Sequence, residues 1–394
     1  MTQQRLLLDA RLFSCFPPSI DHRPSTIDYR PSTIDHRPLA DTDTDSIHYL
    51  IVDYRLWSII KMKNSCFSQS QFLFYPFWNC ITCIGLRRCF RFLQITNPHA
   101  YGDTISHFDL PPPPPPPPPL QRRRRRSPPP SVVALTIDDG LSRGGLSTSM
   151  ADDVFDLLDK YNAHATFFVC TDYIKDQQES VRTLFQRGHE VGNHMQADRL
   201  WYYQKLEPHE FQSQLQDANR ILDDLEALYG GGTTGTTTTT TKTRWFRAPQ
   251  GIMTSSMSQV LQQDPTIKHV LGDCYCDDWS FAEDVDHLFT IKNNGGWITD
   301  ETLCTTKQIA RREAVMKKVA KLMLAQAKVG SVAILHMPER GFRQGGLLAL
   351  EYFLEGIQKK GWSCVNLTEM QLCCQHEEKI ARVEGEDDFL NNPM

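Results

Sequence analysis

Apolar positions follow two alternating patterns from residue 131 onward. Short apolar runs, typical of strands buried on both faces, alternate with stretches whose apolar residues recur every three or four positions, as in amphipathic helices. The expected strands are residues 131–137, 165–170, 245–249, 268–272, 332–336 and 363–367. The expected helices are residues 150–161, 206–229, 255–263, 306–326 and 344–360, with a further helix ending over 181–187, before Gly188.

The alternation of strands and helices predicts a parallel α/β sheet or barrel. Catalytic side chains in such folds gather at the carboxyl ends of the strands. A glycine- and threonine-rich run, residues 230–241, interrupts the pattern and is expected to be an inserted surface loop.

Residues 1–130 show neither pattern, and we expect a low-complexity, disordered extension there. A P-S-T-I-D-(H/Y)-R repeat spans residues 18–38, and its prolines block helices and sheet ladders. A proline run at 111–119 favours polyproline II, and an arginine run follows at 122–126. The expected folded domain is therefore 131–375, followed by an acidic tail at 376–394.

One apolar stretch in the extension, residues 72–86, leaves membrane association open. It is shorter than the roughly 18–20 residues that a spanning helix needs. Three interpretations remain: a signal-anchor, a signal peptide of a chain that starts near Met62, or an error in the gene model. A secreted or membrane-anchored protein is the favoured interpretation, and a membrane tether stays open.

Composition narrows the classes of function. Apolar residues make up 40% of the 394 residues, which is enough for a large core. The formal net charge of -5 argues against a nucleic-acid partner, because such binders are basic over their folded part. The 12 cysteines do not fix the redox compartment, and nothing in the sequence fixes the oligomeric state.

Candidate catalytic residues stand at the expected strand ends. Asp138 and Asp139 are adjacent acids after the first strand, so one carboxylate can face a metal while the other faces a water. His194 and Asp198 are four positions apart, which puts both on one face if the segment is helical and suits one metal ion. Arg247 turns toward the same rim, where it can neutralise a buried carboxylate.

The remaining strand ends add an acid and a histidine. Asp278 and Trp279 follow the expected strand 268–272, and His336 ends an apolar strand. His164 and His189 are interpreted as structural, since neither has a partner of matching chemistry nearby in the sequence.

In this order, the motifs resemble those of the NodB-homology polysaccharide deacetylases, the fourth carbohydrate esterase family. The matching segments are Thr136-Ile137-Asp138-Asp139-Gly140 for T-F-D-D-G, Gly192-Asn193-His194 with Asp198 for H-(S/T)-x-x-H, Arg247-Ala248-Pro249-Gln250-Gly251 for R-x-P-x-G, Asp278-Trp279 for D-W, and Leu335-His336 for L-x-H. The resemblance covers about residues 131–370 and implies an irregular, incomplete (β/α) barrel.

The resemblance also implies a reaction and a role for each residue. It implies a metal-dependent hydrolase that removes acetyl groups from N-acetylated sugars of a chitin-like polysaccharide or oligosaccharide. The implied metal ligands are Asp139, His194 and Asp198. The implied catalytic residues are Asp138 as base, His336 as acid, Arg247 to orient Asp138 and Asp278 to tune His336. The implied substrate-binding residues are Pro249, Trp279 and Leu335.

Three positions depart from the family pattern. Asp198 replaces a histidine, which makes the ligand set harder. The divalent ion is expected to be zinc, with cobalt, manganese or iron favoured more than usual. Tyr275 stands where the family has its upstream acid, with Asp273 two positions earlier, and Leu141 replaces a proline.

Two alternatives keep the same site. An O-acetyl esterase or another amidase would use it on a different acylated substrate. A catalytically inactive, carbohydrate-binding pseudoenzyme would bind an acetylated glycan without turnover.

Overall fold

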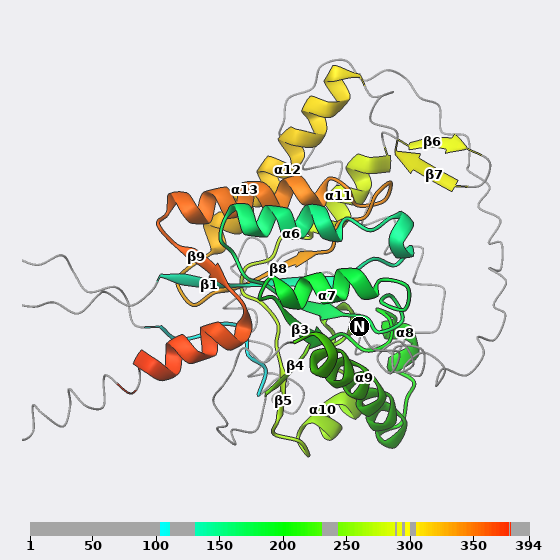
Figure 1. Cartoon of the computed structure of the whole chain (residues 1–394), viewed down its shortest axis with the longest axis vertical. Helices are drawn as coiled ribbons and strands as arrows, with labels where there is room; N and C mark the ends of the chain where they lie inside the picture. The colour runs from blue at the N-terminus through cyan, green and yellow to red at the C-terminus, as the bar shows by residue number, and fades with distance from the viewer. Residues whose placement is uncertain are drawn as a thin grey trace, which may run out of the picture. The chain divides into compact units, whose positions relative to one another are not determined.

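A computed structural model describes residues 103–110, 131–230, 243–287, 290–293, 296–299, 305–377 and 379 (Figure 1). All of them fall in the second of two units into which the chain divides, Ile81–Met394. The repeats, the apolar stretch 72–86, the proline and arginine runs, nearly all of the Gly/Thr run and most of the acidic tail lie outside the described residues. None of the described helices combines the length and apolar character that crossing a membrane requires.

The centre of the domain is a parallel seven-stranded sheet in the order β5-β4-β3-β2-β1-β8, with β9 also paired to β1. Its strands are β1 Val132–Gly140, β2 Thr166–Val169, β3 Glu190–Asn193, β4 Arg244–Phe246, β5 Ile267–His269, β8 Val332–His336 and β9 Ser363–Val365. Every expected strand is present. β1, β2 and β4 are buried throughout, whereas β5 and β9 are only partly buried.

The chain beyond β5 joins the two edges of this sheet. Val270 N donates to Phe246 O of β4 at 2.9 Å, and Cys274 forms a parallel bridge to Ala333 of β8. The sheet therefore curls into a barrel that a single bridge closes. This confirms the expected irregular, incomplete (β/α) barrel.

Helices cover the barrel where the apolar periodicity predicts them. The expected ones are α6 Ala151–Lys160, α7 Gln178–Gln186, α9 Pro208–Tyr229, α10 Ser255–Leu261, α12 Thr306–Gln326 and α13 Gly346–Lys359. Elements without a sequence signal are the 3₁₀ turns η1 Gly145–Ser147 and η2 Pro249–Gly251, the helices α8 Leu200–Tyr203 and α11 Asp278–His287, and the hairpin of β6 Thr290–Asn293 and β7 Gly296–Thr299. Figure 1 shows this hairpin beyond the end of α11.

Side chains of β1 separate two apolar layers. Alternate residues over 133–137 join the large core beneath the helices. Val132 and Ala134 face a smaller cluster inside the barrel, and Thr136 and Asp138 follow them on that side. The barrel interior is therefore apolar at the amino end of β1 and polar at its carboxyl end, where the candidate site lies.

Residues 103–110 belong to this domain, although they fall within the extension that the sequence led us to expect as disordered. Ile105 N donates to His269 O at 3.0 Å, and Phe108 N donates to Gly330 O at 2.8 Å. Ile105, Phe108 and Leu110 pack against the smaller cluster. Three apolar residues among polar ones carry too little periodicity to be recognised in the sequence.

Candidate metal and catalytic site

The structure brings the candidate polar residues together at the carboxyl ends of the strands. Asp138 and Asp139 lie at the carboxyl end of β1, and His194 directly follows β3. Arg247 directly follows β4, and His336 is the last residue of β8, in register with Asp138 on the neighbouring strand. Strand order and polarity alone therefore gather side chains that are far apart in the sequence.

Asp138 forms a buried ion pair with Arg247 inside the barrel. Arg247 Nη1 donates to Asp138 Oδ1 at 2.5 Å and to Thr136 Oγ1 at 2.8 Å. Arg247 Nε donates to Val270 O at 3.0 Å. The guanidinium carbon also lies 4.1 Å from the centroid of the Phe168 ring. Burial lowers the pKa of Arg247, while the Asp138 carboxylate opposes this. The pair fixes the position of the Asp138 carboxylate inside the barrel.

His336 is held by Asp278, the first residue of α11. Asp278 Oδ1 lies 2.9 Å from His336 Nδ1, and Oδ2 accepts from the backbone N of His336 at 2.8 Å. A carboxylate on Nδ1 keeps a proton there and leaves Nε2 to exchange protons with a substrate. Burial alone would lower the pKa of His336, but the charge and hydrogen bond of Asp278 raise it above its usual value.

A second group consists of Asp139, His194 and Asp198. His194 Nδ1 lies 2.9 Å from Arg247 O, and because a carbonyl can only accept, Nδ1 carries the proton. His194 Nε2 is then a free electron-pair donor. It lies 4.0 Å from Asp139 Oδ1 and 3.9 Å from Asp198 Oδ1.

A divalent cation fits this group. Asp139 is only 1% exposed, and its Oδ1 has no hydrogen-bond partner among the described residues. A buried carboxylate oxygen without a partner is costly unless a ligand satisfies it. Asp139 Oδ1 and His194 Nε2 therefore present a carboxylate and an imidazole to one point, a donor set that suits zinc and related ions.

Residues 194–198 are not helical, so the condition under which a four-residue spacing would put His194 and Asp198 on one face is not met. Asn193 Oδ1 accepts from Met195 N at 2.6 Å, and Met195 adopts a φ of 63°, so the chain turns sharply out of β3. Asp198 reaches His194 because Gln250 N, in η2, donates to its Oδ1 at 2.7 Å. Loop geometry, not helical spacing, brings the two side chains together.

Cys170 is a donor that sequence reasoning did not single out. Its sulfur, Asp139 and His194 each place one ligand atom within 4.8 Å of the others. The thiol is directed at His194 O, 3.6 Å away. Burial, Asp139 and Asp198 raise the pKa of Cys170 well above its usual value, which disfavours the thiolate that metal binding needs.

Two arginines that the sequence did not reveal support Asp139. Arg143 and Arg343 both donate to Asp139 Oδ2, the latter at 2.8 Å, which leaves Oδ1 to face His194. Burial alone would raise the pKa of Asp139, but the charges of Arg143 and Arg343 hold it well below its usual range. Burial and the charge of Asp139 raise the pKa of Asp198.

Trp279 lies beside the proton-transfer pair. Its ring centroid is 6.3 Å from that of His336, and the Arg343 guanidinium lies 5.4 Å from the indole centroid. Tyr275, at the position of the missing upstream acid, accepts from Trp279 Nε1 at 3.0 Å. Asp273 is instead bonded to Val332 N at 3.0 Å and so ties β8 to the preceding segment.

The assignment of Leu335 to substrate binding is wrong. Leu335 is 1% exposed in the core beneath the helices. Successive side chains of a strand point to opposite faces, so the residue on the His336 side of β8 is Ile334. Pro249 is buried at the start of η2, next to the Gln250 amide that holds Asp198.

The two histidines interpreted as structural take no part in the cluster. His189 stacks on Phe155 at 5.6 Å, and neither of its ring nitrogens has a hydrogen-bond partner among the described residues. His164 Nδ1 lies 2.7 Å from Glu369 Oε1.

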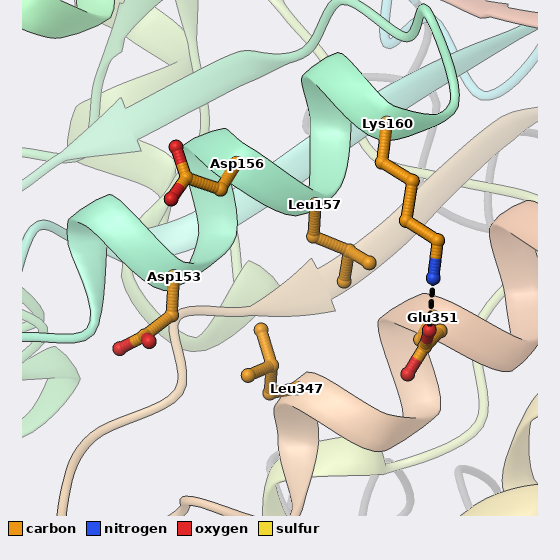
Figure 2. Close-up of a pocket in the computed structure, with 6 residues that line it drawn as sticks. All are labelled: Asp153, Asp156, Leu157, Lys160, Leu347 and Glu351. Atoms are coloured by element: carbon orange, nitrogen blue, oxygen red, sulfur yellow. Dashed lines mark hydrogen bonds and ion pairs between the residues drawn. The ribbon is translucent and has the colours of Figure 1, made fainter.

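A groove of about 250 Å³ lies elsewhere, between α6 and α13 (Figure 2). It is lined by Asp153, Asp156, Leu157, Lys160, Leu347 and Glu351. Its charged groups are already paired: Lys160 with Glu351, Asp153 with Arg340 and Asp156 with Arg187. The groove therefore offers no unsatisfied group to a ligand.

The fold and the side chains at the strand ends define a parallel α/β-barrel protein. A buried cluster of acids and histidines lies at the carboxyl ends of its strands. More specifically, residues 125–266 match the family model for polysaccharide deacetylase. This match confirms the resemblance seen in the motifs.

Individual relatives match over shorter stretches. The peptidoglycan-N-acetylmuramic acid deacetylase PdaC of Bacillus subtilis (strain 168) is 32% identical over 94 residues, which are 24% of this chain and 19% of PdaC. A chitooligosaccharide deacetylase of Bradyrhizobium sp. (strain ANU 289) is 31% identical over 127 residues, 32% of this chain and 48% of the relative. The chain thus spans less than half the length of both relatives. The solved structure of Bacillus subtilis PdaC aligns with a TM-score of 0.43 at 20% identity, over 64% of this chain and 96% of that one.

Proposed function

We propose that the chain is a metal-dependent hydrolase that removes acetyl groups from N-acetylated sugars of a chitin-like or related glycan, and that residues 131–375 carry the reaction. The observation that carries this proposal is the placement of two oriented proton-transfer groups beside one candidate metal group. Asp138 is paired with Arg247, and His336 is paired with Asp278. Asp138 and His336 are in register on neighbouring strands, and Asp138 directly precedes Asp139.

Each pair suits one half of an amide hydrolysis. Asp138, held in position by Arg247, takes the proton of the attacking water. His336, kept protonated by Asp278, gives a proton to the departing nitrogen, without which an amine is a poor leaving group. Trp279 bounds the space beside His336 and so suits the small acetyl group.

Asp139, His194 and Asp198 are the proposed metal ligands. A divalent ion held there supplies polarisation of the acetyl carbonyl and acidifies the water. Arg143 and Arg343 offset the second carboxylate, which replaces the neutral histidine of the family pattern. Cys170 is not included, because its thiol is directed at His194 O, 3.6 Å away.

Acetate release from chitooligosaccharides and from peptidoglycan fragments tests the proposal. The full chain is stripped of metal and then given zinc, cobalt or manganese. We expect metal-dependent acetate release and a loss of about 10²–10⁴-fold in kcat for Asp138→Asn, with metal binding retained. Asp198→Ala should weaken metal binding at least about tenfold, whereas Cys170→Ser should retain it.

The absorption spectrum of the cobalt-loaded protein shows, without any turnover, whether the third ligand is the sulfur of Cys170 or an oxygen of Asp198. A sulfur-to-cobalt charge-transfer band that disappears in Cys170→Ser would replace Asp198 by Cys170 in the ligand set. Metal binding without acetate release from any N-acetylated glycan would contradict the proposed hydrolysis. It would leave an O-acetyl substrate or a carbohydrate-binding pseudoenzyme.

A further inference from the structure

Arg143 stands between the two carboxylates of the candidate metal group. Its Nη2 atom donates to Asp139 Oδ2 and lies 3.9 Å from Asp198 Oδ2. On the other side, His194 Nε2 lies 4.0 Å from Asp139 Oδ1 and 3.9 Å from Asp198 Oδ1. Each carboxylate therefore turns one oxygen toward the arginine and the other toward the imidazole. The oxygens that Arg143 contacts are not the ones that face His194, so the arginine and a metal ion do not compete for the same atoms.

This arrangement offsets a repulsion that the aspartate at position 198 creates. Two carboxylates that approach the same imidazole repel each other, and a cation between them counteracts the repulsion. Asp198 lies on the loop after β3, where Gln250 N donates to its Oδ1 at 2.7 Å and its side chain is 15% exposed. Repulsion from Asp139 pushes Asp198 away from His194 unless Arg143 attracts both carboxylates. A neutral histidine at this position, as in the family pattern, creates no such repulsion.

The backbone next to Arg143 is fixed by buried polar side chains. The preceding residue, Ser142, is buried, and its hydroxyl donates to Glu339 Oε2 at 3.3 Å. Gln177 Nε2 donates to Ser142 O at 3.1 Å. Glu339, on the loop after β8, also pairs with Ser149 in an antiparallel bridge. The Arg143 side chain therefore extends from a turn that is already held in place, unlike an exposed ion pair that is free to rearrange.

We propose that Arg143 is a positioning residue that bridges Asp139 and Asp198, and that this bridge allows an aspartate to serve as the third metal ligand. The charge of Arg143 holds both carboxylates beside His194 before an ion binds, so the ion does not have to bring them together. This inference rests on the proposed function for the metal site.

Arg343 provides the matched control for Arg143. It donates to the same oxygen of Asp139, at 2.8 Å, but in the part of the chain that the structure describes it forms no ion pair with Asp198. Removal of either arginine takes one positive charge away from Asp139. Only the removal of Arg143 also takes a positive charge away from Asp198, so the two variants separate the bridge from a general loss of charge.

The zinc affinity of the full chain, measured by competition with a chromophoric chelator, tests the bridge in a double-mutant cycle. With Asp198 present, we expect Arg143→Gln to weaken zinc binding about tenfold or more, because the two carboxylates are no longer held together. In the Asp198→Asn background, the same change should weaken zinc binding less than about threefold. Arg143→Lys, which keeps the charge, should weaken zinc binding less than Arg143→Gln. Arg343→Gln should have the same effect in both backgrounds.

Equal effects of Arg143→Gln in the two backgrounds would overturn the bridge. Tighter zinc binding in Arg143→Gln would also overturn it, because the guanidinium would then act mainly by repelling the ion. Circular dichroism of each metal-free variant checks that the fold is kept. If Arg143→Gln does not fold, the effects of Arg143→Lys in the two backgrounds decide, with the larger loss of affinity expected where Asp198 is present.

Acetate release by the same proteins separates this result from the proposed function. A loss of zinc affinity that depends on Asp198, in a parent that never releases acetate, would sustain the bridge and refute the hydrolysis. Acetate release by the parent, with equal effects of Arg143→Gln in both backgrounds, would do the reverse. A parent that binds no divalent ion would refute both.

Discussion

The proton-transfer role of His336 depends on one neighbouring carboxylate. Asp278 contacts both the imidazole and the backbone N of His336, and it raises the pKa of His336 against the effect of burial. The raised pKa means that protonated His336 persists above pH 6.5, the usual value for histidine. The same protonation stabilises the folded state below pH 6.5, and this contribution is lost as the pH rises through the raised pKa.

Asp278→Asn should therefore shift the pH dependence of acetate release. In the parent protein the alkaline limb of kcat/KM should lie above pH 6.5, because activity is lost when His336 deprotonates. Without the Asp278 charge we expect this limb to move down by about one pH unit, together with a loss of at least roughly tenfold in kcat.

Asp277→Asn is the control for that shift. It removes a carboxylate one residue away that accepts from the Tyr275 hydroxyl at 2.8 Å. An alkaline limb that stays in place in Asp278→Asn would show that His336 is not the group titrating in this range.

At the scale of elements, β3 is held by a histidine that is buried in its neutral form. His189 immediately precedes β3 and packs between Phe155 of α6 and Phe167 of β2. Burial, with the charges of His164 and Arg187, lowers the pKa of His189 to about 3. The neutral form contributes stability above pH 6.5, and the contribution is lost as the pH falls, because the unfolded chain then binds a proton that the folded one does not.

His189→Phe should remove part of the acid sensitivity of folding. Between pH 8 and pH 5.5 the parent should lose about 1.4 kcal/mol of unfolding free energy through this one residue. The variant should lose that much less, measured by urea unfolding at both pH values. His209→Phe, at an exposed position of α9, controls for the loss of a histidine. Identical losses in His189→Phe and the parent would place the acid sensitivity elsewhere.

The sequence predicted every strand of the main sheet except β3, the longer helices, and the gathering of polar side chains at the strand ends, because these depend on local apolar periodicity and on strand order. It did not predict α11 or the β6–β7 hairpin, whose apolar residues follow no clear period. It missed Arg343 because this side chain reaches Asp139 from a position 204 residues further along the chain, and it missed Arg143 because this contact depends on the turn that follows β1. Leu335 was assigned to substrate binding by its place in a motif. Side chains alternate along β8, however, and Leu335 points into the core beneath the helices.

Across the whole domain, residues 103–110 close the barrel at the end opposite the candidate site. Gly330, just before β8, has a φ of +82°, and a Cβ there would lie 2.0 Å from Phe108 O. Only glycine both adopts this φ without strain and lets the Phe108 backbone approach so closely. The segment and the turn before β8 therefore depend on each other, and we expect the folded domain to include residues 103–110.

Thermal unfolding of chains that begin at residue 100 and at residue 131 tests this expectation. Removing Ile105, Phe108 and Leu110 uncovers the cluster of Val270, Trp245 and Leu367. We expect a loss of about 2–4 kcal/mol, or roughly 5–10 °C in Tm. The variant Gly330→Ala provides a second, independent test of this contact. In the longer chain it combines the strain of a positive φ with a clash against Phe108, whereas in the shorter chain only the strain remains. Gly330→Ala should therefore lower Tm more in the longer chain. Equal effects in both chains, or equal Tm values for the two parents, would show that residues 103–110 do not stabilise the barrel.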